Sequence, residues 1–308
     1  MNRLALIRSR LPAELLIKVR AASVNPLDWH YMRGTPYFMR IQGGLRKPKV
    51  IRLGVDFAGT VEAVGRNVTR FKPGDEVFGG RTGAFAEYVT VFEDRAVALK
   101  PANITFEQAA AVPIAAITAL QGLRDKGKIQ PGQKVLINGA SGGVGTFAVQ
   151  IAKSFGADVT GVCSTKNVKL VRSIGADRVV DYTKEDFTKS ADRYDVILDN
   201  VGNHSLSECR RVLQPKGKYI MVGGPRGRWI DPLPRMIGIL LQSRFVSQEV
   251  GMFLAQLKQE DLTILGDLMQ AGKVTPVIDR RFPLSELPSA IGYLEAGHAR
   301  GKVVITFN

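Results

Sequence analysis

A glycine-rich segment at residues 135–150 carries the residues best suited to chemistry. Its sequence is VLINGASGGVGTFAVQ, in which Ala140, Gly142 and Gly145 occupy the positions of a G-x-G-x-x-G dinucleotide fingerprint, with alanine replacing the first glycine. Gly142 lets the backbone approach a pyrophosphate, and Gly145 lets a helix pack closely on a strand. Free N–H groups at the start of that helix favour an anion. The segment predicts a phosphate-binding loop made of Ala140, Ser141, Gly142, Gly143, Val144 and Gly145.

The residues after the next predicted strand indicate which dinucleotide binds. NAD sites usually carry an acidic residue about 20 residues after the glycines, because its carboxylate accepts the ribose 2′-hydroxyl. Here the strand ends at Cys163, and Ser164 and Lys166 follow. A hydroxyl and an ammonium group favour a 2′-phosphate, with Lys169 and Tyr182 as further candidate contacts. We expect NADP to be preferred over NAD, unless these are ordinary solvated residues of a loop.

The elements that must position this loop alternate between strands and helices, which is typical of a parallel sheet. Helices are expected at 143–155 and 168–174. Six strands would complete a doubly wound Rossmann domain. They are expected at 134–138, 158–163, 178–181, 194–199, 218–222 and 244–249.

The first hundred residues have a different pattern, of short strands separated by turns such as Lys72-Pro-Gly-Asp75. This predicts a bent, β-rich domain, followed by a helical stretch at 106–123. After the Rossmann strands we expect helices at 261–271 and 284–296 and strands at 277–282 and 302–307. The fold class is therefore α/β, with one β-rich domain over 1–105, completed by 276–308, and a Rossmann domain over 106–275.

Composition excludes several classes of protein. The chain has 308 residues, 45% of them hydrophobic and 23% charged, which is typical of a globular protein with more than one core. No apolar run approaches the ~20 residues of a membrane-spanning helix. Two cysteines give no disulfide framework, so we expect a reducing, cytoplasmic setting. The first ten residues are basic, yet a strand pattern follows from Glu14, so we expect no transit peptide.

The net charge of +15 leaves a nucleic-acid partner open. Lysine and arginine are scattered, however, and no long basic run occurs. We therefore expect a small-molecule partner rather than RNA.

The chain resembles the medium-chain dehydrogenase/reductase superfamily over nearly its whole length, and most closely its zinc-free quinone oxidoreductase (zeta-crystallin-like) branch. Besides the glycine loop, the segments that carry the resemblance are AASVNPLD at 21–28, GVDFAG at 54–59, KPGDEVF at 72–78, AAAVP at 109–113 and GKVVI at 301–305. The resemblance implies a GroES-like catalytic domain, a Rossmann domain and a cofactor in the cleft between them. It also implies an N-terminal hairpin, for which this sequence has too few residues before Glu14.

The resemblance implies that zinc is absent. Zinc-dependent members carry a cysteine where this chain has Asn25, Gly-His-Glu where it has Gly54-Val-Asp56, and a later cysteine near Ile114. The three histidines, His30, His204 and His298, are isolated and show no ligand spacing. We expect no metal site.

Without a Lewis acid, the fitting reaction is hydride transfer from NADPH to a quinone or an α,β-unsaturated carbonyl compound. By resemblance, Asn25 and Asp28 line the active cleft, Thr118 contacts the nicotinamide side, and a loop of Val222, Gly223 and Gly224 lies beneath the ring. A carbonyl oxygen that gains charge needs a hydrogen-bond donor. The candidates are Asn25, His30, Tyr31 and Tyr37. Asp28 has either a catalytic role or a turn-stabilising one.

Two alternatives remain. One is an alcohol or aldehyde dehydrogenase of the same fold. The other is a non-enzymatic nucleotide- or RNA-binding relative, which the charge of +15 leaves open. By analogy we expect a homodimer formed along the edge strand at 244–249.

Overall fold

The computed structural model describes residues 13–35, 37, 40, 44, 52–223 and 247–307. The chain divides into two compact units. The first takes its described residues from 13–33, 52–117 and 256–307, and the second is built mainly from 118–223 and 247–255.

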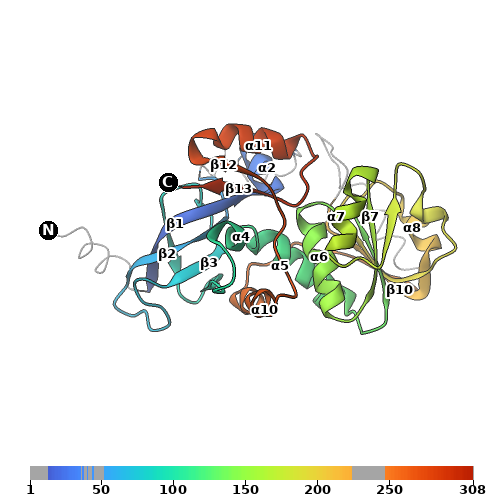
Figure 1. The fold of residues 1–308 in the computed structure, drawn as a ribbon, viewed down its shortest axis with the longest axis horizontal. Helices are drawn as coiled ribbons and strands as arrows, with labels where there is room; N and C mark the ends of the chain where they lie inside the picture. The colour runs from blue at the N-terminus through green and yellow to red at the C-terminus, as the bar shows by residue number, and fades with distance from the viewer. Residues whose placement is uncertain are drawn as a thin grey trace. The chain divides into compact units, whose positions relative to one another are not determined.

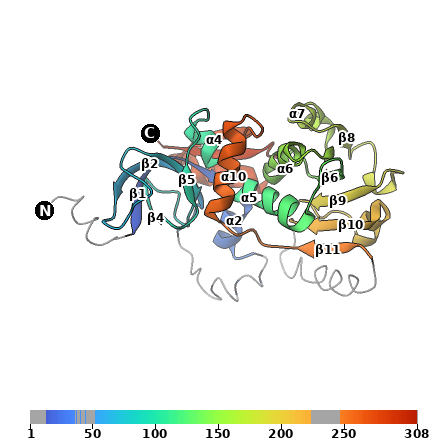
Figure 2. The ribbon, with the colours of Figure 1, turned by 90° about the horizontal axis from the view of Figure 1, so that it is seen from below.

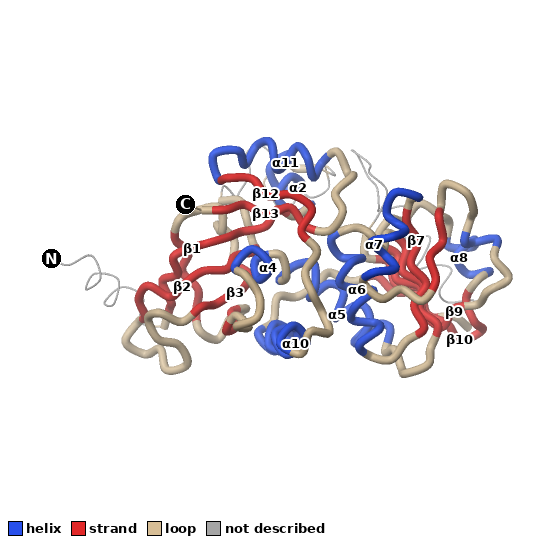
Figure 3. Tube along the Cα trace, in the orientation of Figure 1, coloured by secondary structure: helices blue, strands red, loops and turns tan. Residues whose placement is uncertain are grey.

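The first unit is built on a sheet with the strand order β12-β13-β1-β2-β3-β5, to which β4 is added beside β1. Figure 3 shows these strands in red. Their bounds are β1 Glu14–Val24, β2 Asp56–Val64, β3 Glu76–Gly80, β4 Tyr88–Phe92, β5 Val97–Leu99, β12 Ile278–Pro283 and β13 Lys302–Thr306.

The long strand β1 organises this sheet. One of its edges pairs with β2, while the other pairs with β4 over Glu14–Lys18 and with β13 over Ala21–Val24, all antiparallel. The last strand of the chain therefore completes the sheet that the first strand begins. Figure 1 shows β13 beside β1.

Helices cover this sheet locally. Helix α11 (Leu287–Glu295) lies beside α2 (Pro26–Arg33) above β12 and β13 (Figure 1). Ala290 and Ile291 of α11 pack with Val303 and Ile305 of β13 in one buried cluster. The remaining helices are α4 Phe106–Ala110, α5 Pro113–Gln121, α10 Gln259–Gln270 and the short η5 Leu284–Glu286.

The helical stretch expected over 106–123 is present, but it is divided into two helices. Helix α4 ends at its C-cap, Ala111, and α5 begins at Pro113. Proline has no N–H to continue a helix but fits the first helical position. After α5 the chain forms a π-helical segment, η1 (Gly122–Gly127), which ends at Lys128 in the left-handed conformation.

The second unit holds the parallel sheet expected from the sequence, which confirms the fold class. Its strand order is β11-β10-β9-β6-β7-β8, with every pair parallel. This is the order of a complete dinucleotide-binding fold. Figure 2 shows β11 at one edge. The bounds are β6 Lys134–Asn138, α6 Gly143–Ser154, β7 Asp158–Cys163, η2 Thr165–Asn167, α7 Val168–Ser173, β8 Arg178–Asp181, η3 Phe187–Lys189, β9 Tyr194–Asp199, α8 Leu206–Arg211, β10 Leu213–Met221 and β11 Glu249–Met252.

The sixth strand lies later than expected. The sequence predicted 244–249, of which 244–246 lie outside the described residues, and β11 starts only at Glu249. Ser247 and Gln248 instead use their side chains to bind the backbone at the start of β10, at the carbonyl oxygens of Pro215 and Gln214. The ladder with β10 therefore begins after them, at Glu249.

The division into units also differs from the expected boundaries, because 106–117 and 256–275 belong to the first unit rather than to the Rossmann domain. Side chains fix α10 to the first unit. Gln259 Nε2 donates to the Val97 carbonyl at 2.8 Å, and Asn103 Nδ2 donates to the Met269 carbonyl at 2.9 Å.

Candidate functional site

The glycine loop follows the buried strand β6 and leads directly into α6. Gly139 turns the chain with a φ of +78°, which favours glycine. A Cβ at Gly145 would lie 2.0 Å from the Gly139 carbonyl oxygen, so this position must remain glycine. At Gly142 a Cβ would meet only that same oxygen, at 3.5 Å, so the space before Gly142 is open. The loop thus has the close packing and the open face that the fingerprint predicted.

The start of α6 offers free hydrogen-bond donors. Its N-cap, Gly142, has no side chain to cap the helix. The N–H groups of Gly143, Val144 and Gly145 have no acceptor in the part of the chain that the structure describes. Unpaired N–H groups and the helix dipole attract an anion. These residues therefore fit the pyrophosphate of a dinucleotide.

The end of β7 holds the residues expected to select the cofactor. Ser164 is 9% exposed, whereas Lys166 and Lys169 are exposed. Tyr182 is also exposed, and its N–H donates to the Cys163 carbonyl at 3.0 Å, which keeps it beside the end of β7. Ser164 and Lys166 therefore follow the carboxyl end of β7, Tyr182 follows that of β8, and Lys169 lies in α7.

Sequence reasoning missed two polar residues there. Asn167 donates from Nδ2 to the hydroxyl oxygens of Ser141 and Ser164, at 3.0 and 3.2 Å. Asp181, at the end of β8, accepts from the hydroxyl of Thr165 at 2.5 Å. That bond, with further hydrogen bonds from Thr183, lowers the pKa of Asp181. The signal that could have found both is their position at the carboxyl end of a parallel strand.

The other side of the loop is ordered by Asp199 at the end of β9. One carboxylate oxygen accepts from Asn138 Nδ2 and the N–H groups of Val201 and Gly202, and the other accepts from the Tyr219 hydroxyl at 2.6 Å. Strands β6 and β9 flank the point where the strand order reverses, which is where ligands bind in such sheets.

The predicted loop after β10 reaches this point. The N–H groups of Val222 and Gly223 donate to the Asp199 carbonyl at 2.9 and 3.3 Å. A Cβ at Gly223 would lie 2.2 Å from the Asn200 carbonyl oxygen, so only glycine fits. Gly224 lies outside the described residues. Thr118 is buried in α5.

In the first unit, Asn25 belongs to a buried polar cluster with Asp56 and Lys302. Asn25 Nδ2 donates to Asp56 at 2.8 Å and to the Ser23 carbonyl at 3.4 Å, and its Oδ1 accepts from Lys302 at 2.5 Å. Asp56 also accepts from the Ser23 hydroxyl and the Ile114 N–H. Both amide hydrogens of Asn25 are therefore engaged, and only the one at 3.4 Å is held weakly.

Asp28 has the geometry of the turn-stabilising alternative. Its two carboxylate oxygens accept from the N–H groups of Asn25 and Gly54, at 2.8 and 3.0 Å. An acid at the third helical position that binds the N-cap N–H is half of a capping box, here at the start of α2. Burial raises the pKa of Asp28 to about 6, against the lowering effect of these two bonds. A catalytic role for Asp28 remains a prediction.

The other donor candidates lie on or after α2. His30 stacks on Trp29 with ring centroids 3.7 Å apart. The Arg40 guanidinium lies 4.5 Å from the centroid of the Tyr37 ring. Tyr31 lies within α2. Their roles as donors remain predictions.

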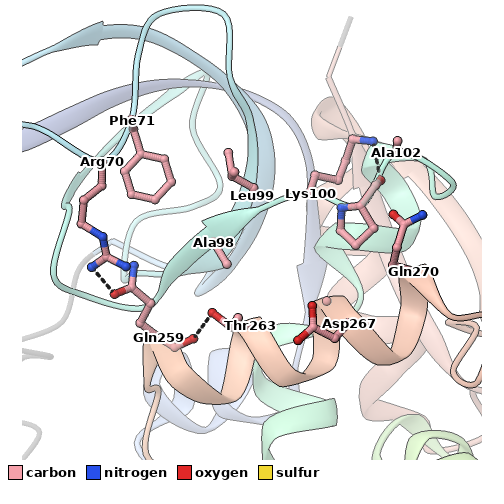
Figure 4. A pocket seen from close by; sticks show the side chains of 12 residues that line it. Arg70, Phe71, Ala98, Leu99, Lys100, Ala102, Gln259, Thr263, Asp267 and Gln270 are labelled. Atoms are coloured by element: carbon pink, nitrogen blue, oxygen red, sulfur yellow. Dashed lines mark hydrogen bonds between the residues drawn. The ribbon is translucent and has the colours of Figure 1, made fainter.

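The first unit also has a surface pocket of about 380 Å³ between β5 and α10 (Figure 4). The Arg70 guanidinium donates to the Gln259 side-chain oxygen at 2.6 Å, and Figure 4 draws this hydrogen bond. None of the predicted site residues lines this pocket.

Within the described residues, no three His, Cys, Asp or Glu side chains form a group able to hold a metal ion. The same residues contain no helix of the length and apolarity needed to span a membrane.

Comparison with known proteins places the chain in a family. Residues 11–101 match the family model described as an alcohol dehydrogenase GroES-like domain, and residues 174–305 match the one described as a zinc-binding dehydrogenase. The mitochondrial NAD(P)H oxidoreductase RTN4IP1 of Mus musculus is 37% identical, over 96% of this chain and 82% of its own.

Two further relatives agree. The chloroplastic NADPH-dependent alkenal/one oxidoreductase of Arabidopsis thaliana is 37% identical, over 95% of this chain and 72% of its own. The structure of a quinone oxidoreductase from Coxiella burnetii aligns with a TM-score of 0.82 and 31% identity, over 97% of this chain and 92% of that one. The chain therefore belongs to the medium-chain dehydrogenase/reductase superfamily of oxidoreductases, in its quinone oxidoreductase branch.

Proposed function

We propose that this protein is an NADPH-dependent reductase that transfers hydride to a quinone or an α,β-unsaturated carbonyl compound. The observation that carries the proposal is the glycine loop, with its open face at Gly142 and the free N–H groups of α6, at the switch point of a parallel sheet. The names of the relatives, quinone oxidoreductase and alkenal/one oxidoreductase, support this substrate class.

In this proposal, different residues of the second unit bind the pyrophosphate and the 2′-phosphate of NADPH. The α6 N–H groups and Ser141 hold the pyrophosphate, while Ser164 and Lys166 hold the 2′-phosphate, with Lys169 and Tyr182 beside them. When bound, NADPH supplies the hydride. A charged and a neutral hydrogen bond to the 2′-phosphate give a preference for NADP over NAD of roughly 10²–10³-fold.

The acceptor needs a hydrogen-bond donor and no metal in this proposal. Asn25 is our first candidate for the donor, because one of its two amide hydrogens makes only a long hydrogen bond, with Nδ2 3.4 Å from the Ser23 carbonyl oxygen. His30, Tyr31 and Tyr37 are the others. Asn25, Val55 and Ile114 stand where zinc ligands would, which supports a zinc-independent reaction.

The test is NADPH oxidation across a panel of quinones, enones and aldehydes, with and without a chelator. We expect turnover of quinones or enones, little turnover of saturated aldehydes, and no effect of the chelator. Turnover confined to alcohols and saturated aldehydes, or one tightly held zinc per chain, contradicts the proposal.

Cofactor preference is tested separately with the double variant Ser164→Ala/Lys166→Ala. We expect its NADPH affinity to fall towards its NADH affinity. Lys189→Ala is a matched control, since that lysine is 78% exposed in the same unit and its ammonium group lies 3.8 Å from the Asp186 carboxylate. An unchanged ratio of NADPH to NADH affinity in the double variant contradicts the assignment.

We also propose a cytoplasmic homodimer formed along β11. Two apolar side chains at this edge support it, since Met252 is 37% and Leu254 is 93% exposed. Light scattering of the wild type should give twice the mass of one chain. The Leu254→Lys variant should give the mass of a single chain. Cell fractionation tests the cytoplasmic location. The test is needed because relatives are named mitochondrial and chloroplastic.

A further inference from the structure

Asn167 joins the two parts of the proposed cofactor site. It ends the short helix η2 and is 7% exposed. One amide hydrogen reaches the Ser141 hydroxyl oxygen in the glycine loop, and the other reaches the Ser164 hydroxyl oxygen after β7. Its backbone N–H is also fixed, at 2.8 Å from the Ser164 carbonyl. Asn167 thus holds two serine side chains that are 23 residues apart in sequence.

This arrangement orients the hydroxyl groups. Each serine oxygen accepts a hydrogen from Asn167, so each keeps its own hydrogen to donate elsewhere. Phosphate oxygens are acceptors and need such donors. Ser141 and Ser164 are therefore prepared for an anionic ligand.

The remaining side-chain atom of Asn167 is unpaired. Its Oδ1 is buried and has no hydrogen-bond partner among the residues that the structure describes. Buried polar atoms are nearly always paired, so an unpaired one at a ligand-binding edge indicates a missing donor. Since Oδ1 only accepts, that donor is an O–H or N–H group and not a phosphate.

The adenosine ribose of NADP offers such a group. This ribose carries phosphate at the 2′-position, which leaves the 3′-hydroxyl as the only hydroxyl donor of that sugar. We propose that Asn167 is a cofactor-binding residue that accepts the adenosine ribose 3′-hydroxyl while holding Ser141 and Ser164 for the phosphates. This inference rests on the proposed function and adds the contact to the sugar.

The experiment measures binding of adenosine fragments rather than turnover. Calorimetry gives the affinities of 2′,5′-ADP and its 3′-deoxy analogue for the wild type, Asn167→Ala, Asn167→Asp and Lys166→Ala. In the wild type, removing the 3′-hydroxyl should weaken binding about tenfold, as expected for one hydrogen bond. Asn167→Ala should bind both fragments equally.

Two variants serve as controls. Asn167→Asp keeps an acceptor, so it should retain the discrimination between the fragments, although its charge weakens both by repelling the 2′-phosphate. Lys166→Ala should weaken both fragments and also keep their ratio. If Asn167→Ala unfolds, the ratio of the two fragment affinities in Asn167→Asp decides. In the alternative in which the Asn167 amide is rotated and donates to a phosphate, Asn167→Asp should lose the discrimination between the fragments.

The possible failures are distinguishable. If the wild type binds NADPH but Asn167→Ala keeps the wild-type ratio between the fragments, this inference is wrong and the proposed function stands. If the wild type binds neither NADPH nor the fragments, both are wrong.

Discussion

The Asp28 carboxyl group couples the stability of the first unit to pH. It is 2% exposed, and burial raises its pKa to about 6 from a value of 3.8. A raised carboxyl pKa means that the folded state binds the proton more tightly than the unfolded state does. The protonated Asp28 carboxyl group therefore contributes its full stabilisation of the folded state below pH 3.8, and this contribution is lost as the pH rises through 6.

We predict that this titration is visible in the free energy of unfolding. Between pH 4.5 and 7, Asp28 should lower the stability of the wild type by about 2 kcal/mol. The stability of Asp28→Asn should lack this decrease between the two pH values. The control Asp94→Asn, whose side chain is 77% exposed, should keep the decrease. Urea unfolding at the two pH values measures the difference. Identical pH slopes for the wild type and Asp28→Asn would show that Asp28 does not titrate in this range.

Lys302 is the buried cation that Asp56 requires. The two residues are 3% and 0% exposed, and Lys302 Nζ lies 3.5 Å from the Asp56 carboxylate. Burial lowers the pKa of Lys302, while Asp56 and Asp28 oppose the change. The pair is therefore held within the low-dielectric interior of the first unit.

Removing the lysine should be costly. We predict that Lys302→Met destabilises the protein by about 3–5 kcal/mol, because it leaves a buried carboxylate without its cation. Lys184→Met should change the stability by less than about 0.5 kcal/mol, because that side chain is 71% exposed. Chemical denaturation compares them. Equal stability of the two variants would refute the role given to Lys302.

At the scale of elements, the turns and the parallel strands could be predicted from sequence. The bounds predicted for β6, β7, β8 and β9 agree with the structure, because each is a short apolar run closed by a glycine, proline or polar turn. The strand at 244–249 was predicted wrongly, because side-chain bonds from Ser247 and Gln248 to distant backbone decide where β11 begins.

Substitution of two helical glycines by alanine tests how closely each helix packs on its neighbours. At Gly145 in α6 a Cβ would lie 2.0 Å from the Gly139 oxygen, whereas at Gly292 in α11 nothing lies within 4 Å of it. We predict that Gly145→Ala destabilises the protein and abolishes NADPH binding, because α6 must move away from the loop. Gly292→Ala should stabilise it by up to about 1 kcal/mol, since alanine is the better helix former. Thermal unfolding and NADPH titration measure both. A Gly145→Ala variant that binds normally would contradict the assigned role of this glycine.

At the scale of the whole molecule, cofactor binding should increase the free energy of unfolding. A ligand that binds only the folded chain adds about 2.7 kcal/mol at a concentration of 100 times its Kd. We predict that NADPH raises the Tm by several degrees and that NADH at the same concentration raises it less. The Ser164→Ala/Lys166→Ala variant should respond equally to both. Differential scanning calorimetry tests this, and equal shifts in the wild type would contradict the NADPH preference.

The sequence by itself determined the parallel sheet and the glycine loop, because these depend on turn chemistry and hydrophobic periodicity between near neighbours. Its motifs also carried the resemblance to the superfamily. Tertiary structure alone decided which polar groups meet. Lys302 reaches Asn25 across 277 positions, and Asn167 reaches Ser141 across 26. Such hydrogen bonds follow from strand order and register, and no local pattern specifies them. The same reason explains why the sequence did not show that Asn25 shares a buried hydrogen-bond network with Asp56 and Lys302.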